Sequence, residues 1–107
     1  MKKFLGMLLL LILCQGAYSE EKSDWEYSFI KGLNHEERKE WSSAIQELEK
    51  SRALQKDNPL ILKELGYCYA KQGDFEKARD CYERVLQLEP EDSNAKKNLK
   101  ILLETKN

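Results

Sequence analysis

The chain has 107 residues, of which 35% are charged and 41% apolar, and its formal net charge at pH 7 is −1. This length leaves room for one small domain, and the composition is that of a globular protein, which excludes a disordered chain. Acidic and basic residues are mixed along the sequence, which excludes a polybasic surface for nucleic acid or for a membrane.

The first nineteen residues have the three-part pattern of a secretory signal peptide. Lys2 and Lys3 precede an apolar run from Phe4 to Leu13, and small and polar residues follow. A helix that crosses a bilayer needs about 20 apolar residues, and this run is too short for that. We therefore expect residues 1–19 to be a signal peptide, residues 20–23 to be a polar lead-in, and the protein to be exported, either to the periplasm or out of the cell.

The end of this signal peptide is open to alternatives. Cleavage after Ser19 would leave small side chains at the last and third-last positions, Ser19 and Ala17, as signal peptidases require. Cleavage after Gly16 also remains open. In a third interpretation the chain is a lipoprotein that is acylated at Cys14 and anchored in the envelope, although Leu13 is bulkier than the residue usual before such a cysteine.

The remaining sequence predicts helices and no strand. A first helix is expected from about Asp24 to Glu36, because apolar residues recur at helical spacing from Trp25 onward. Ser23 and Glu26 have the spacing of a capping box at its start. The charged segment that follows contains no glycine, and we place the break between the first two helices at Arg38 to Glu40.

The second helix carries an apolar side from Trp41 to Leu54. Asn58 and Pro59 predict the start of a third helix, because the asparagine side chain can cap it and proline is well suited to the first helical position. Gly73 provides a left-handed exit and Asp74 a new cap, so the third and fourth helices should form an antiparallel hairpin. Pro90 ends the fourth helix, and a last helix is expected to about Glu104.

The sequence also repeats itself. A shift of 34 residues pairs small residues with small ones and large apolar residues with large apolar ones, without gaps. Helical periodicity alone does not explain such a single offset. The pairs are Gly32 with Gly66, Trp41 with Phe75, Ala44 with Ala78, Leu48 with Tyr82, and Leu54 with Leu88.

A helix-turn-helix period of this length resembles the tetratricopeptide repeat family. The resemblance implies an all-α fold, a short antiparallel helix-turn-helix solenoid of five helices over residues 24–107. It would contain about two repeats, 25–58 and 59–92, and a C-terminal capping helix, 93–105. The residues that carry the resemblance are Leu65, Gly66, Tyr69, Lys71 to Phe75, Ala78, Tyr82 and Pro90, and, in a degenerate first repeat, Gly32, Trp41 and Ala44.

We expect the helices of the second repeat to approach closely where Gly66 meets Ala78. The aromatic side chains of Tyr69, Phe75 and Tyr82 would fill the space around that contact.

Cys68 and Cys81 lie on the two facing helices of this hairpin, and an exported protein can form disulfides. In the register set by Gly66 and Ala78, however, they are more than a helical turn apart. A disulfide needs Cα atoms within roughly 7 Å of each other. We therefore favour two buried thiols, and a bridge remains the alternative.

The sequence offers little that points to catalysis. His35 is the only histidine, and no nucleophile motif accompanies it. Glu36, Glu37 and Glu40 are best interpreted as carboxylates of a solvated loop, not as metal ligands or an acid-base pair. We predict that the protein is not an enzyme and holds neither a cofactor nor a metal.

The resemblance implies that the first helix of each repeat lines a concave surface that binds a partner. Mixed aromatic, aliphatic and lysine side chains there suit an amphipathic helix or an extended peptide with acidic residues. Lys63 would fit a grip on a terminal carboxylate, but Tyr67 stands where an asparagine would be wanted. The implied lining residues are Glu26, Phe29, Leu33, Leu60, Lys63, Tyr67, Lys71, Lys97 and Ile101.

We therefore expect an adaptor or scaffold that binds another protein or peptide in the periplasm or envelope. Binding of nucleic acid is not expected, and a membrane would be contacted only through an acylated Cys14. The alternatives are an anchored lipoprotein scaffold and an accessory subunit of an envelope enzyme. Because such solenoids usually need about three repeats, the edge with Trp25, Tyr27 and Phe29 is predicted to pack on a partner or on a second copy.

Overall fold

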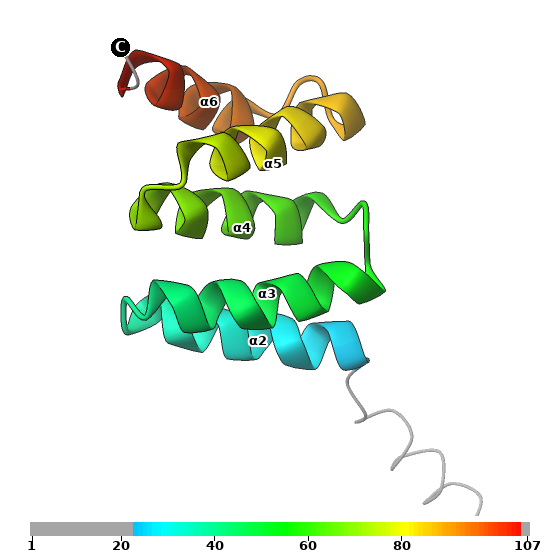
Figure 1. Cartoon of the computed structure of the whole chain (residues 1–107). Helices are drawn as coiled ribbons and strands as arrows, with labels where there is room; N and C mark the ends of the chain where they lie inside the picture. Colours follow the sequence, from blue (N-terminus) through cyan, green and yellow to red (C-terminus); the bar gives the residue numbers. More distant parts are fainter. Residues whose placement is uncertain (1–22, 106–107) are drawn as a thin grey trace, which may run out of the picture.

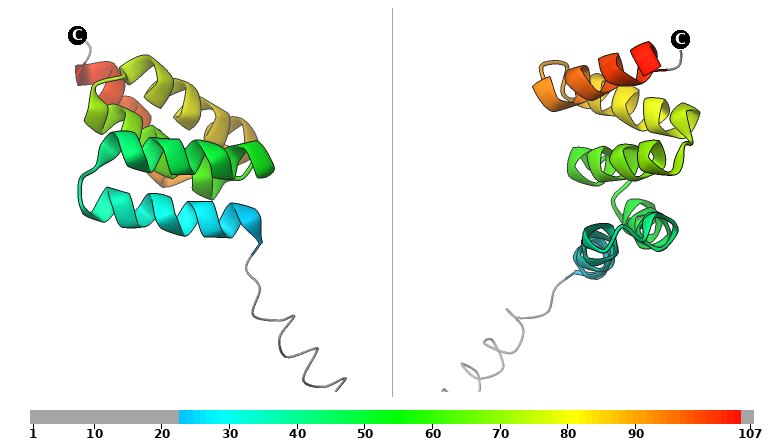
Figure 2. Two further views of the ribbon diagram at one scale, coloured as in Figure 1. Left: turned by 60° about the horizontal axis from the view of Figure 1, so that its bottom comes forward. Right: turned by 90° about the vertical axis from the view of Figure 1, so that its left-hand side faces the viewer.

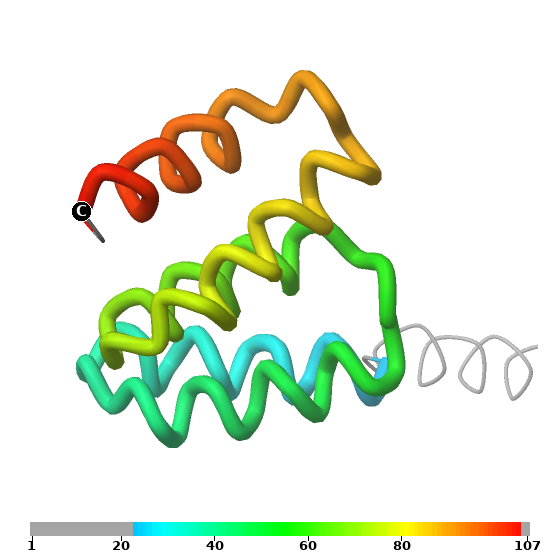
Figure 3. Tube along the Cα trace, turned by 45° about the horizontal axis from the view of Figure 1, so that its top comes forward, coloured from blue at the N-terminus to red at the C-terminus, as the bar shows by residue number. Residues whose placement is uncertain are grey.

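The computed structural model describes residues 23–105, so the predicted signal peptide and Cys14 lie outside the described residues. Figure 1 shows the helices lying one above another in chain order, and the trace in Figure 3 reverses at alternate ends of this stack. The predicted all-α fold of five antiparallel helices is confirmed for the described residues. The helices are α2 (Asp24–Glu37), α3 (Trp41–Leu54), α4 (Pro59–Gln72), α5 (Phe75–Leu88) and α6 (Ser93–Thr105).

Helices α2 and α3 form one hairpin and α4 and α5 a second, and α6 packs on α5. The two hairpins are turned relative to each other. In the right-hand view of Figure 2, α2 and α3 are seen almost end-on, whereas α4 is seen from the side. Such a turn between successive units is what curves a helical solenoid.

Local signals set the boundaries of the second hairpin as predicted. The Asn58 side chain accepts a hydrogen bond of 3.0 Å from a backbone N–H in the first turn of α4, which begins at Pro59. Gly73 ends α4 with a φ of 89°, in the left-handed region that glycine adopts without strain. Asp74 then caps α5 through a backbone N–H at 3.3 Å.

The start of α2 differs from the prediction. Ser23 is the N-cap residue, but its side chain makes no capping hydrogen bond to the first turn of α2 within residues 23–105. The predicted capping box with Glu26 is therefore wrong. A residue of α3 holds this turn instead, because the buried Ser51 hydroxyl donates a hydrogen bond of 2.8 Å to the Trp25 carbonyl oxygen. This contact spans 26 residues of sequence and ties the first turn of α2 to α3, but it is made to a carbonyl oxygen and is not a helix cap.

Each hairpin closes at a glycine. A Cβ atom added at Gly66 would lie 2.8 Å from ring atoms of Tyr82, and one added at Gly32 would lie 2.8 Å from the Leu48 side chain. Leu48 and Tyr82 are related by the 34-residue shift, so the two hairpins make the same close contact. Gly66 thus leaves room for the Tyr82 ring, and the nearest atoms belong to that ring instead of to the predicted Ala78.

The residues that the repeat pattern marked as packing residues lie mostly in the core. Trp41 and Phe75, each the first residue of its helix, are half-buried against it. Pro90 is exposed after the end of α5. The others are buried: Gly32, Ala44, Leu65, Gly66, Tyr69, Ala78 and Tyr82.

Cys68 and Cys81 are both free and buried. They face different sides of the hairpin: the Cys68 thiol donates to the Glu36 carboxylate of α2 at 3.7 Å, while Cys81 lines a depression between α3 and α5. Burial raises the pKa of Cys68 to about 12 and that of Cys81 to about 11. Neither thiol therefore ionises readily at neutral pH, and thiols of this kind react slowly.

Candidate protein-binding groove

The surface over α2, α4 and α6 is hollowed by three depressions that all include Tyr67. One lies between α2 and α4 and reaches Trp41, a second of about 760 Å³ lies between α4 and α6, and a third extends along α4, α5 and α6. We call the surface they form together the groove. Its residues are Leu33, Asn34, Glu36, Glu37, Lys39, Trp41, Leu60, Lys63, Glu64, Tyr67, Ala70, Lys71, Phe75, Tyr82, Ser93, Asn94, Lys97, Asn98, Ile101, Leu102 and Thr105.

Most of the lining residues implied by the resemblance meet in this groove, and two do not. Phe29 turns to Trp25, with ring centroids 6.2 Å apart, and packs on the core. Glu26 is half-buried on α2 and lines none of the three depressions. The residues that the structure brings together are Leu33, Leu60, Lys63, Tyr67, Lys71, Lys97 and Ile101.

Tyr67 is the centre of the groove. The residue is 40% exposed, and its ring meets the Trp41 ring edge-on, with centroids 5.8 Å apart and planes at 78°. The Lys71 ammonium, one helical turn further along α4, lies 5.4 Å from the ring centroid. An aromatic side chain held on two sides in this way presents a fixed apolar surface at little cost in side-chain entropy.

Lys63, which was expected to suit the binding of a partner's terminal carboxylate, already forms an ion pair within the chain. Its ammonium lies 2.8 Å from the Asp92 carboxylate, which also accepts a hydrogen bond of 2.8 Å from the Ala95 backbone N–H at the start of α6. The hydrogen bond from Lys63 holds the pKa of Asp92 below its usual range. A partner's carboxylate could use Lys63 only in competition with Asp92.

Two further groove residues form a carboxyl pair that the sequence interpretation missed. Glu36 on α2 faces Glu64 on α4, and the interpretation of Glu36 as a loop carboxylate is wrong. Burial, together with the hydrogen bond and the charge of Glu64, raises the pKa of Glu36 to about 7. The signal was present, because Glu36 follows Leu33 by three positions and Glu64 follows Leu60 by four, which places each on the groove side of its helix.

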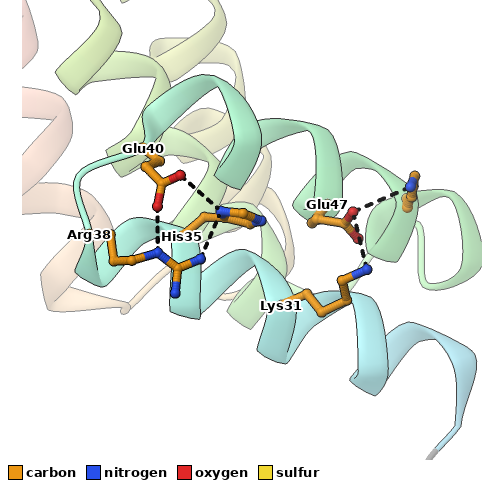
Figure 4. A network of polar contacts seen from close by, with 6 residues as sticks. Lys31, His35, Arg38, Glu40 and Glu47 are labelled. Carbon is orange, nitrogen blue, oxygen red and sulfur yellow. Dashed lines mark hydrogen bonds and ion pairs between the residues drawn. The ribbon is translucent and has the colours of Figure 1, made fainter.

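His35 belongs to an ion cluster on the outer surface of the first hairpin (Figure 4). Its Nδ1 atom lies 3.2 Å from the Arg38 guanidinium and 3.6 Å from the Glu40 carboxylate, which Arg38 also contacts. The hydrogen bond from Arg38 lowers the pKa of Glu40. In the same view Lys31 of α2 reaches Glu47 of α3 at 3.8 Å, so exposed ion pairs link the two helices.

The edge that was predicted to pack on a partner or on a second copy presents one of its three aromatic residues to solvent. Tyr27 is 60% exposed, whereas Trp25 and Phe29 pack against the core. Among residues 23–105, no helix is long and apolar enough to cross a membrane. No group of three or more His, Cys, Asp or Glu side chains within that range could hold a metal ion.

The comparisons with known proteins agree with the fold. Among solved structures, the Sgt2 TPR domain from Aspergillus fumigatus is similar at 25% identity and a TM-score of 0.71, over 76% of this chain and 54% of that one. A point mutant of MamA has a similar fold, at 19% identity and a TM-score of 0.72, over 80% of this chain and 63% of that one. The chain thus spans less than two thirds of either structure.

No curated protein matches the chain. The family model of the tetratricopeptide repeat matches residues 59–92, which comprise α4, α5 and the turn to α6, and no catalytic family is indicated. Residues 59–92 are therefore a tetratricopeptide repeat, set in a five-helix fold like that of tetratricopeptide-repeat proteins.

Proposed function

We propose that this chain is an exported adaptor or scaffold that binds a segment of another protein in the groove. The supporting observation is a row of large apolar side chains that face solvent there: Leu60 and Ile101 are each 49% exposed, and Tyr67 between them is 40% exposed. Exposed apolar side chains gathered in a groove and bordered by polar ones are typical of surfaces that bind a helix or an extended peptide.

Site-specific photocrosslinking tests this proposal. A photoreactive phenylalanine analogue at position 67 of the full chain should crosslink to a partner protein in the cells that produce it. The matched control is the same analogue at Asp80, which is exposed in the depression between α3 and α5 that shares no residue with the groove. Equal crosslinking at both positions, or none at position 67, would contradict binding in the groove.

Export is the second part of the proposal, and its support is the pattern of Lys2, Lys3 and the apolar run that follows. Intact mass of the chain recovered from fractionated cells should show loss of residues 1–19 in the exported fraction. Full-length protein in the cytoplasmic fraction would contradict export.

Cys14 supports an alternative, an anchored lipoprotein scaffold. In that case the chain would begin at Cys14, incorporate labelled palmitate and sediment with membranes, whereas cleavage after Ser19 gives a protein without lipid. A third role, as accessory subunit of an envelope enzyme, predicts a copurified activity that the isolated chain lacks.

A further inference from the structure

The middle of the groove carries negative charge that the chain itself does not neutralise. Glu36, Glu64 and Tyr67 each line both the depression between α2 and α4 and the one between α4 and α6. None of the ion pairs within residues 23–105 includes Glu36 or Glu64. Lys63, which lines the same depression as this pair, is held by Asp92 instead.

Beside these carboxyl groups the groove has an apolar wall. Leu33, Trp41 and Tyr67 line the α2–α4 depression together with Glu36 and Glu64. An arginine or lysine side chain has an apolar stem and a charged head, and it binds best where the stem meets an apolar surface and the head meets carboxylates. Aromatic rings add to this attraction when a cation lies near their faces.

On the basis of the proposed binding of a protein segment, we infer that the α2–α4 part of the groove docks a segment bearing an arginine. Its guanidinium lies between Glu36 and Glu64, and its stem lies along Tyr67. Charge complementarity commits this end to a basic partner, in contrast to the acidic peptide that the lysines had suggested. The lysines Lys71 and Lys97 lie further toward α6, so the partner's acidic residues are expected on that side.

The protonation of Glu36 gives this docking a characteristic dependence on pH. The titratable groups that face Glu36 are Glu64 and the neutral Cys68 thiol on α4, and Glu37, Lys39, Lys63 and Lys97 line the two depressions that Glu36 also lines. Burial and Glu64 raise the pKa of Glu36 to about 7, so the pair holds a proton at acidic pH. A guanidinium requires the ionised pair, so its binding should release a proton and tighten as pH rises from 6 to 8.

The experiment selects binders for the full chain from a phage-displayed library of random dodecapeptides. Selected peptides that no longer bind the Tyr67→Ala variant are retained as groove binders. We expect arginine or lysine to be enriched in them. Each leading peptide is then synthesised with arginine and with citrulline, which has nearly the same shape and no charge.

Citrulline should weaken binding about tenfold and remove its rise with pH, because charge-assisted hydrogen bonds are lost. Glu64→Gln should weaken the arginine peptide to a similar extent, whereas Glu83→Gln, an exposed carboxylate on α5 outside the groove, should not. If Glu64→Gln fails to fold, the citrulline and pH comparisons on the unmodified chain still decide.

Groove binders without a basic residue, or equal affinity for arginine and citrulline peptides, would overturn this inference and leave the proposed function intact. A selection that yields no peptide dependent on Tyr67 would count against both. Arginine peptides whose binding depends on Tyr67 and on Glu64 and tightens with pH would support both.

Discussion

The two hairpins share one backbone design and differ greatly in what they bury. Gly32 against Leu48 and Gly66 against Tyr82 are equivalent close contacts. Yet α4 has six buried residues and α5 has four, whereas α2 has one and α3 has three. The close contact at the glycine is therefore common to both hairpins. The number of residues that each hairpin buries is decided by its other positions.

The difference comes from positions related by the 34-residue shift. Where the second hairpin has Leu62, Leu65 and Tyr69 in the core, the first has Ser28, Lys31 and His35. Lys31 and His35 pair with acidic residues of the same hairpin at its surface, and surface ion pairs contribute little to stability. We infer that the first hairpin depends on packing against α4 for much of its stability.

The largest expected effect is a difference in stability between variants at equivalent positions of the two hairpins, Leu65 and Lys31. Leu65→Ala should lower the free energy of unfolding by about 2–5 kcal/mol, because it leaves a cavity in a fully buried site. Lys31→Ala in the first hairpin should change it by less than about 0.5 kcal/mol. Urea denaturation followed by circular dichroism measures both, and comparable losses would refute the contrast between the two cores.

The next effect tests the close glycine contact that the two hairpins share. Gly66→Leu and Gly32→Leu should each destabilise by about 1–3 kcal/mol or more, because even a Cβ atom would lie 2.8 Å from a buried side chain. The cost should be larger at Gly66, since the rigid Tyr82 ring cannot move aside as a leucine can. Thermal unfolding of the two variants checks this, with Lys63→Ala as a control that should fold normally. Unchanged stability of either glycine variant would mean that the close contact at that glycine is wrong.

A smaller effect distinguishes the starts of the two hairpins. Asn58→Ala removes the side-chain cap of α4 and should cost about 0.5–2 kcal/mol. Ser23→Ala should cause no measurable change, because the Ser23 side chain does not cap the described first turn of α2. Equal losses in denaturation experiments would show that Ser23 caps α2 in solution.

The last effect lies between the hairpins and depends on pH. The folded chain holds the Glu36 proton up to about pH 7, whereas the unfolded chain releases it near the ordinary value of 4.5. The contribution of this group to stability is thus present below pH 4.5 and is lost as pH rises to about 7. Chemical denaturation between pH 5 and 8 should show this decline in the wild type and not in Glu36→Gln, and parallel profiles would contradict it.

Much of the fold was predictable because its signals are local. Asn58 with Pro59, and Gly73 with Asp74, determine helix ends within a few residues, and the structure places the ends there. The spacing of Gly32 and Gly66 marked the equivalent helices. Local patterns also misled at Ser23, whose side chain makes no capping hydrogen bond to the first turn of α2, and a distant hydroxyl, that of Ser51, ties this turn to α3.

The groove was less predictable because its decisive contacts join residues far apart in sequence. Glu36 was interpreted from its charged neighbours, but its environment is set by burial and by Glu64 on another helix. The availability of Lys63 likewise depends on Asp92, which is 29 residues away. Positions within a repeat show which side chains reach the groove, and only the three-dimensional structure shows which of them are already paired.

The contact between Lys63 and Asp92 couples the first turn of α6 to the binding of a ligand in the groove. Asp92 holds the first turn of α6 through the Ala95 N–H while Lys63 ties it to α4, so one ion pair links these two helices across the groove. A carboxylate that draws Lys63 away would release the first turn of α6 from α4. Occupancy of the groove would then loosen the terminal helix, whereas salt, which screens a partly buried pair such as this one much less than an exposed pair, would loosen it little.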